Sequence, residues 1–421
     1  MNLRRTIIQS IQSRAWLLLL STAIILINTR TLGPEGQGQI AWIQLGLLLV
    51  TGASGFIAGG AVVYLKKVIP LRATLLPGHL WLVISSIGTT ALGIQMGFLP
   101  EHHMFDIALL GWLQGIIIFH GQLLLGAQNI RAHNRLQVMQ NACVTAGLAL
   151  VYFVWGWQHV DAFLAVLGIS LVATALLSIP PLRHLPQTDS QPPLKEVIRL
   201  LWKHGSAAQA GGLLQMLTNR TNFSLLARST GNGASATGIY SVAFYALEAM
   251  WIVARGLAPV VHARTANNSD RNQRIRETRG MLGLAVLTTI PLACSAALIP
   301  DSWYAHIVGF GGIQPVVLRL LPAAIAGAMA SILAHHLSGI GQHKWNAYSS
   351  GLGLFVLSLG AWQWIPTHGI HGAAYAASVA AVMQTICLVF AWSDCEQSPW
   401  LNLWPRWSEI RSSVVRSEEI Q

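Results

Sequence analysis

The chain has few charged residues, few cysteines and no segment long enough for a large soluble domain. Only 10% of its 421 residues are charged and 53% are hydrophobic, which excludes an ordinary soluble protein. Its four cysteines show neither disulfide nor metal-ligand spacing, so we expect no metal site and no cofactor. The gaps between the hydrophobic runs are too short for a catalytic module, so we do not expect an enzyme.

Twelve apolar runs occupy most of the chain. Each is long enough to cross the hydrocarbon core, which takes about 20 residues. The predicted spans are 14–29, 40–65, 74–99, 104–128, 136–157, 160–180, 205–227, 238–263, 280–299, 313–339, 345–365 and 369–393. The sequence therefore predicts an all-α polytopic membrane protein.

The basic residues lie mainly in every second gap between these spans. Of the 26 Lys and Arg residues, all but five lie at the N-terminus, in the even-numbered gaps or in the C-terminal tail. The odd-numbered gaps carry only Arg30 and Arg228. The positive-inside rule then predicts that both termini are cytoplasmic. We expect the protein in the cytoplasmic (inner) membrane. The net charge of +11 meets anionic lipid headgroups at that face, so we expect membrane lipids and no nucleic acid as partners.

A weak internal repeat predicts two lobes of six helices each. Arg30-Thr31 and Arg228-Ser229 both precede glycine-rich turns, and Gly126-Ala127-Gln128 matches the segment 339–342. Trp155-Gly156-Trp157 is matched with Trp362-Gln363-Trp364 at the ends of spans 5 and 11. Six helices repeated in the same orientation predict a pseudo-twofold axis along the membrane normal, with the substrate path between the lobes.

The expected domain boundaries follow from this repeat. Prolines at 180–181, 186 and 192–193 should stop helices, and the segment 194–203 should form a short amphipathic helix on the cytoplasmic interface. We expect an N-terminal lobe at 1–180, a cytoplasmic linker at 181–204, a C-terminal lobe at 205–393 and a cytoplasmic tail at 394–421.

Three short motifs resemble those of polysaccharide flippases of the multidrug/oligosaccharidyl-lipid/polysaccharide exporter (MOP) superfamily. They are the segment from Arg30 to Gly38, the segment 238–243 with Leu257-Ala258-Pro259-Val260, and the segment 365–374. The resemblance covers nearly the whole chain. It implies a V-shaped bundle that moves undecaprenyl-pyrophosphate-linked oligosaccharide outward for surface polysaccharide (O-antigen) synthesis. Glycan polymerase and chain-length proteins are further partners that it implies.

Polar side chains inside the spans are the candidates for function, because burying them in hydrocarbon costs free energy. Span 238–263 places Ser241, Glu248, Arg255 and His262 at intervals of seven, so one continuous helix would align them in a narrow stripe. Span 14–29 repeats this spacing with Arg14, Ser21 and Asn28, and span 205–227 adds Gln215, Asn219 and Asn222 beside Arg220. The resemblance places these helices around the central cavity. The predicted substrate-binding residues are Arg220, Arg255, Glu248, Arg319, Asn219, Asn28 and Ser21.

An excess of arginine over carboxylate within the spans favours an anionic substrate, since guanidinium forks match phosphate oxygens. An alternative is that Glu248, Arg220 and Arg255 only hold helices together, and Arg319 could extend outward instead. Arg30 and Arg228 are helix-turn anchors or gate residues. His120, His335 and His336 are expected to pack or to form hydrogen bonds, and proton relay is their alternative role.

Other functions compete with polysaccharide export. A peptidoglycan lipid-precursor flippase has the same need to bind pyrophosphate. A multidrug cation antiporter of the same superfamily would need intramembrane acids, for which Glu248 and Asp106 are the candidates. A glycan polymerase or ligase is disfavoured because no long outer loop carries paired carboxylates. An inert scaffold in a glycan assembly complex also remains, and loss of transport on removing one buried arginine would exclude it.

Overall fold

Gly33 separates the first two predicted spans, which otherwise form one continuous helix. Helix α1 runs over Leu3–Ala58, and Gly33 alone leaves helical geometry, with φ 65° and ψ −169°. A residue without Cβ adopts such a φ at little cost, and Pro34 then begins the second half of α1 where a proline suits a helix. The predicted gap at 30–39 is therefore wrong in length, because a single residue breaks the helix.

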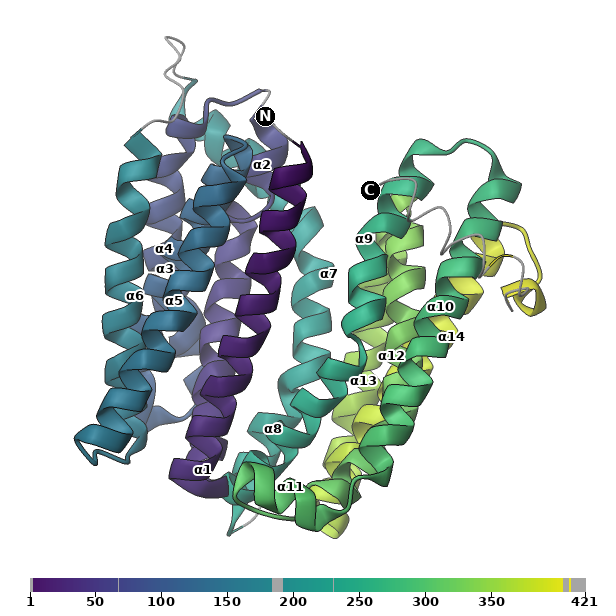
Figure 1. Ribbon diagram of the computed structural model, residues 1–421. Coiled ribbons are helices and arrows are strands. Elements are labelled where there is room, and N and C mark those ends of the chain that lie inside the picture. Colours follow the sequence, from purple (N-terminus) through teal and green to yellow (C-terminus); the bar gives the residue numbers. More distant parts are fainter. Residues whose placement is uncertain (1–2, 67, 184–191, 230, 404–408, 410–421) are drawn as a thin grey trace. The chain divides into compact units, whose positions relative to one another are not determined.

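The computed structural model describes residues 3–66, 68–183, 192–229, 231–403 and 409 (Figure 1). Pro186, Thr230 and most of the predicted tail lie outside these residues. The described residues form 14 α-helices and no strand, which confirms the predicted all-α class. The chain divides into two units, unit 1 (Met1–Leu213) and unit 2 (Leu214–Gln421), and the division falls inside helix α7.

Unit 1 holds five long helices and the first half of a sixth. Its elements are α1, α2 (Ala61–Leu65), η1 (Leu71–Thr74), α3 (Leu75–Gln95), η2 (Glu101–His103), α4 (Met104–Gly126), α5 (Ile130–Ala149) with a π-helical end (Leu150–Val154), α6 (Val160–Arg183) and the start of α7 (Leu194–Ser229). Pro180 and Pro181 lie inside the last turn of α6, so the expected helix stop at this pair is wrong by about one turn.

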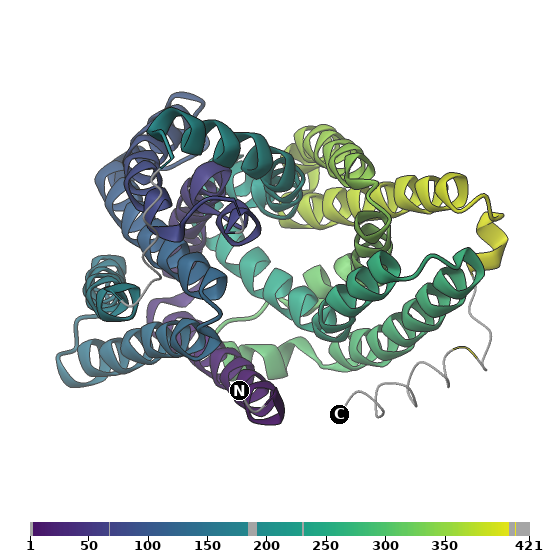
Figure 2. The same ribbon diagram turned by 90° about the horizontal axis from the view of Figure 1, so that it is seen from above.

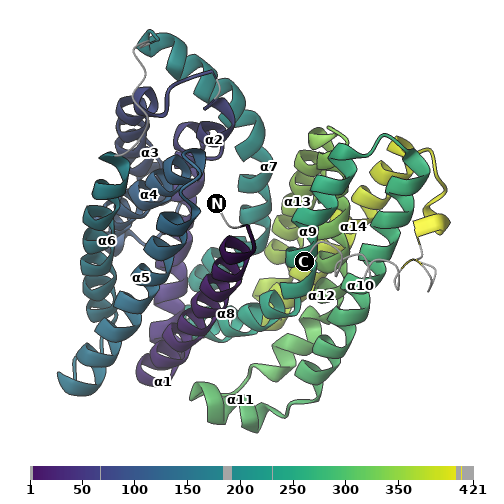
Figure 3. The same cartoon turned by 45° about the horizontal axis from the view of Figure 1, so that its top comes forward.

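Unit 2 contains the end of α7 and seven further helices. They are α8 (Gly233–Met250), α9 (Ile252–Asn267), α10 (Arg271–Leu298), α11 (Asp301–Val308), α12 (Gln314–Gly339), α13 (His343–His368) and α14 (Ile370–Cys395), followed by η4 (Trp400–Leu403). Figure 3 shows α9, α10, α12, α13 and α14 bundled in this unit. In each unit we call the end that carries the Lys- and Arg-rich gaps its basic end.

The predicted amphipathic segment 194–203 is not a separate helix but the first turns of α7. Its apolar side chains Val197 and Leu201 are buried in a core that includes Leu82, Phe119 and Leu123. Trp202 stacks on Phe56, with ring centroids 5.6 Å apart. Figure 2 shows this part of α7 lying along unit 1. Burial on one side and exposed Lys and Arg on the other explain the amphipathic pattern without an interruption of the helix.

The number of helices that are apolar throughout is smaller than the twelve spans predicted from the sequence. Among the described residues, eight helices are long and apolar enough to cross a membrane, and the bent pair α8–α9 adds a ninth. One of the eight, Trp16–Leu65, covers both halves of α1 and thus two predicted spans. Helices α7 and α13 correspond to the remaining two, and α7 carries the Gln, Asn and Arg side chains that lower its hydropathy.

In the second half of each unit, the internal repeat is visible in the backbone at an offset of 213 residues. The turn after α4 closes with a hydrogen bond from Asn129 N to Leu124 O of 2.8 Å, and the turn after α12 closes with the same bond from Gln342 N to Leu337 O, also 2.8 Å. Positive φ recurs at Gly156 (68°) and Gly369 (54°), again 213 apart.

This register corrects the predicted tryptophan match. Trp362 and Trp364 lie within α13, before its end at His368, so Gly369 rather than Gln363 is the counterpart of Gly156. The tryptophan pairs resemble one another in composition only.

Helix α11 was not predicted from the sequence, and a single carboxylate joins it to α12. Asp301 accepts hydrogen bonds from the backbone N–H groups of Gly312, Ile313 and Gln314 at 2.6, 2.9 and 3.0 Å. Partial burial alone would raise the pKa of Asp301, but these three donors outweigh it and hold the pKa below its ordinary value. The carboxylate thereby satisfies N–H groups that the start of α12 leaves unpaired.

Candidate functional site

A bend at Trp251 interrupts the predicted span 238–263. Helices α8 and α9 meet there at 49°. The indole N–H of Trp251 donates to Ala324 O in α12 at 2.8 Å, and a Cβ at position 327 would collide with the indole, so Gly327 makes the space that the ring occupies. The bend is therefore fixed by docking of one aromatic ring on α12.

The bend breaks the predicted stripe of four polar residues. Ser241 is fully buried and donates to Gly238 O at 2.8 Å, so it does not line a cavity. Glu248 lies in the last turn of α8, whereas Arg255 and His262 lie beyond the bend in α9. Four residues at intervals of seven align only on a straight helix, and this segment is not straight.

Glu248 bridges two arginines. Arg220 Nη2 in α7 lies 2.8 Å from Glu248 Oε2, and Arg255 Nη2 lies 3.3 Å from Glu248 Oε1. On a straight helix residues seven apart are separated by about 10 Å along the axis. Because the bend falls between Glu248 and Arg255, the two side chains contact each other, which spacing along one straight helix does not predict.

The two arginines differ in their surroundings. Arg220 is only 13% exposed and its guanidinium lies over the rings of Phe223, Phe244 and Tyr245, at 5.0, 5.0 and 5.5 Å from their centroids. Such cation–π contacts each contribute about 0.5–2 kcal/mol. Arg220 is therefore held by both its ring contacts and its ion pair.

Arg255 is held much more loosely. Its side chain is 49% exposed, and it contacts Glu248 through one N–H and the ring of Trp251 at 5.2 Å. An ion pair this exposed adds little to stability. With one carboxylate between two guanidinium groups, the bridge has a net charge of +1, and the accessible part of that charge is on Arg255.

The other predicted residues of unit 2 lie outside this bridge. The amide of Gln215 donates to Asn219 Oδ1 at 3.2 Å, and Asn222 is buried, donating to the Tyr240 hydroxyl at 3.0 Å. Arg319 donates to the Tyr375 hydroxyl at 3.1 Å and to Pro315 O at 2.7 Å, which ties it to α14 and to its own helix. Arg228 is exposed in the last turn of α7.

Three predicted residues belong to unit 1. Ser21 is exposed on α1, and Asn28 is buried, where its Oδ1 accepts a hydrogen bond from the Tyr152 hydroxyl at 3.2 Å. Arg30 is exposed one turn before the break at Gly33.

Two polar networks were missed from the sequence. In the first, Gln215 Oε1 accepts from the Ser350 hydroxyl at 3.0 Å and from the Gln384 amide, which joins α7, α13 and α14. Gln384 in the middle of an apolar span was the signal that could have found it, because a glutamine there needs partners.

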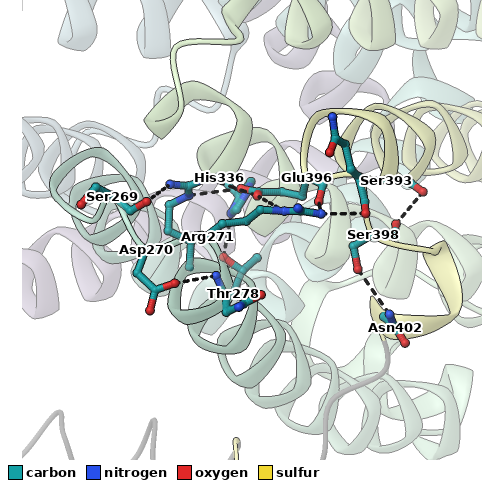
Figure 4. Close-up of polar contacts among 12 residues, drawn as sticks. Ser269, Asp270, Arg271, Thr278, His336, Ser393, Glu396, Ser398 and Asn402 are labelled. Carbon is teal, nitrogen blue, oxygen red and sulfur yellow. Dashed lines mark hydrogen bonds and ion pairs between the residues drawn. The ribbon is translucent and has the colours of Figure 1, made fainter.

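The second missed network surrounds Glu396 at the basic end of unit 2 (Figure 4). Arg274 donates from Nε and Nη2 to the two carboxylate oxygens of Glu396, both at 3.2 Å, and His336 Nε2 lies 3.0 Å from Glu396 Oε1. Arg271 donates to Glu396 O, and the Thr278 hydroxyl lies 2.7 Å from His336 Nδ1.

The side chain of Glu396 is 0% exposed. Burial alone would raise the pKa of Glu396, but the hydrogen bonds from His336 and Arg274 outweigh burial and hold it below its ordinary value. We call this set, Arg271, Arg274, Thr278, His336 and Glu396, the Glu396 clamp. His336 thus forms hydrogen bonds within a packed core, as the sequence analysis expected.

Comparison with known proteins identifies the class of fold. No family model matches the sequence, and no curated protein matches it. An inward-facing multidrug resistance MATE family transporter of the MOP superfamily is similar in structure, with a TM-score of 0.70 and 12% identity over 89% of this chain and 93% of that one. The lipid II flippase MurJ has a TM-score of 0.64 and 10% identity over 97% and 90% of the two chains.

A third neighbour is a MOP superfamily transporter from Pyrococcus furiosus described by the reverse polarity of its binding pocket. Its TM-score is 0.61 and its identity 12%, over 93% of this chain and 95% of that one. These neighbours are transporters and a flippase rather than enzymes, and the chain has their fold. Together with the apolar helices, this shared fold makes the chain a multi-pass membrane protein.

Proposed function

We propose that the chain is a flippase that moves undecaprenyl-pyrophosphate-linked oligosaccharide from the cytoplasmic to the periplasmic leaflet of the inner membrane by alternating access. The observation that carries this proposal is the bridge of Glu248 with Arg220 and Arg255. Its carboxylate is already neutralised and its accessible group is a guanidinium, which favours an anionic ligand.

Arg255 is the group that we assign to the substrate. Its fork can donate two parallel hydrogen bonds to phosphate oxygens, which a single point charge cannot do. Because it is held to Glu248 by one bond of 3.3 Å, it can exchange that partner for phosphate at small cost. Arg220 then keeps Glu248 in place and prevents an uncompensated carboxylate from remaining beside the anionic ligand.

The same bridge weighs against export of cationic drugs. A cation would need an accessible carboxylate, and Glu248 lies between two arginines. Asp106, the other intramembrane acid considered, pairs with His103 at 3.0 Å in the first turn of α4. A peptidoglycan lipid precursor satisfies the same phosphate chemistry, so it is the competing substrate that an experiment must separate.

The test uses protein reconstituted in vesicles with a fluorescent lipid-pyrophosphate-linked oligosaccharide. Arg255→Ala should slow translocation about tenfold or more, because a charge-assisted hydrogen bond contributes about 1.5–3 kcal/mol. Arg255→Lys should recover part of the rate. Arg276→Ala, which removes an exposed arginine in α10, is the matched control and should transport normally.

Three results would count against the proposal. They are full activity of Arg255→Ala, transport of a cationic dye in place of the lipid, and faster transport of a lipid-linked peptidoglycan precursor than of the oligosaccharide carrier. The last result would keep the flippase chemistry and change the substrate.

A further inference from the structure

A histidine-centred chain of hydrogen bonds occurs at the basic end of both units. In unit 2 the buried His336 of α12 contacts Thr278 in α10 and Glu396 after α14. In unit 1 the buried His120 of α4 contacts His79 in α3, with 3.1 Å between the two Nε2 atoms, and Ser178 in α6, with 2.5 Å between Nδ1 and Oγ. One histidine thus joins α3, α4 and α6 in unit 1, and one joins α10, α12 and the residue that follows α14 in unit 2.

A second contact confirms that the two ends correspond. Arg72 Nη2 donates to Arg183 O at 2.9 Å, and Arg271 Nη2 donates to Glu396 O. The acceptors, 183 and 396, are 213 residues apart, the same offset as the turns, whereas the donors are 199 apart and the two histidines 216 apart, so the contacts are similar without matching residue by residue. The two ends differ in charge: unit 2 places a carboxylate against its histidine, whereas in the described part of unit 1 no carboxylate pairs with His79 or His120.

The hydrogen bonds of His79 and His120 allow the pair to bind one proton more than two neutral rings carry. His79 Nδ1 must carry hydrogen, because it lies 2.8 Å from Leu75 O, which can only accept. One hydrogen must also lie between the two Nε2 atoms. The Ser178 hydroxyl has two possible acceptors, His120 Nδ1 at 2.5 Å and Ala175 O at 2.6 Å.

Two arrangements of hydrogens therefore fit the same heavy atoms. If Ser178 donates to His120, both rings are neutral and His120 donates to His79. If Ser178 donates to Ala175 O, His120 donates to Ser178, and the pair holds one additional proton. The change from one arrangement to the other requires only rotation of a hydroxyl, so uptake of a proton needs no movement of a helix.

We propose that His79 and His120 form a proton-binding site that takes up one proton, shared between their Nε2 atoms. A second proton is opposed by repulsion between two cationic rings in contact. The charged or titratable groups on the surrounding elements at this end include Lys66, Arg72, Arg131, His133, Arg135, Arg183, Lys195, Glu196, Arg199, Lys203 and His204. Lys66 and Arg72 donate to Gly126 O and Arg183 O, so their charges are held at the ends of α4 and α6.

Binding of the proton strengthens the connection between three helices. In the protonated form the bonds from the pair to Leu75 O and Ser178 Oγ are charge-assisted, and such bonds are stronger than neutral ones. A fall in pH at this end of unit 1 therefore strengthens the hydrogen bonds that join α3, α4 and α6. This inference concerns proton binding alone and does not depend on the proposed substrate.

Counting protons tests the site directly. Purified protein in detergent is titrated between pH 8 and pH 5, and the double variant His79→Gln/His120→Gln should bind one proton fewer than the unmodified chain. A difference of zero or of two would overturn the proposal. Glutamine keeps one hydrogen-bonding amide at each position, and His204→Gln, in a partly exposed histidine elsewhere in unit 1, is the matched single-histidine control.

A second measurement applies to the unmodified chain and does not require the variants to fold. Nitrogen-15 resonances of two rings that share a proton should shift together with one common midpoint, and a coupling across the N–H···N bond should be detected. The signal assigned by His336→Gln, which belongs to the Glu396 clamp, should not share that midpoint. Separate midpoints for His79 and His120, or no change in either between pH 8 and pH 5, would refute proton sharing.

Discussion

The Glu248 bridge and the Glu396 clamp are built from the same charges and differ in what those charges can still do. Each contains one glutamate and two arginines in unit 2. Glu396 is fully buried, and Arg274 contacts it with two donors, so its hydrogen-bonding capacity is used within the protein. Glu248 is 21% exposed and one of its arginines is half exposed. Charge count alone therefore does not distinguish a structural contact from a binding site, whereas saturation of the donors and acceptors does.

The largest expected effect is loss of stability when the clamp is opened. Glu396→Gln leaves Arg274 and His336 without their carboxylate in a buried position, and breaking a buried ion pair in this way costs about 3–5 kcal/mol. Unfolding of the purified protein in detergent, followed against temperature, measures the change. Glu248→Gln is the matched comparison and should cost much less, because that pair is partly exposed. Equal losses at the two positions would remove the distinction.

The two arginines of the bridge should separate stability from transport. Arg220→Ala should reduce translocation and also destabilise the protein by about 1–3 kcal/mol, since it deletes an ion pair and three ring contacts. Arg255→Ala should reduce translocation by a similar factor and leave the unfolding temperature within about 1 °C. Loss of stability in Arg255→Ala comparable to that of Arg220→Ala would show that both arginines are structural.

Acid should weaken the clamp. The pKa of Glu396 is below its ordinary value in the folded protein, so its contribution to stability is complete above the unfolded value of about 4.5 and is lost as the pH falls through the folded value. Unfolding temperature measured from pH 6 downward should therefore fall more steeply in the unmodified chain than in Glu396→Gln. Parallel curves would contradict this linkage.

The smallest effect is expected at Asp301. Asp301→Asn removes the charge that three backbone N–H groups contact and should cost about 1 kcal/mol, in the range of a lost helix cap. Increased hydrogen exchange at residues 312–314, with unchanged exchange around Glu396, is the measurement. Unchanged protection at 312–314 would show that the carboxylate is not needed there.

Much of the fold could be predicted from the sequence, because long apolar runs and the distribution of Lys and Arg are local signals. The positions of most spans follow from them, and short glycine motifs mark the break at Gly33 and the turn after α4. The bend at Trp251 could not be predicted, since it depends on where the indole docks on α12, and with it the pairing of Glu248 with Arg255 was missed. Glu396 was missed for the same reason: its partners lie 60 or more residues away, at the ends of two other helices.

Trp251 connects the position of Arg255 to that of α12. The indole is tied to Ala324 through its N–H and fits the space above Gly327, while the Arg255 guanidinium lies over the same ring. A displacement of α12 along its axis would therefore also move the indole of Trp251 and the Arg255 guanidinium that lies over it, and so change the distance between Arg255 and Glu248.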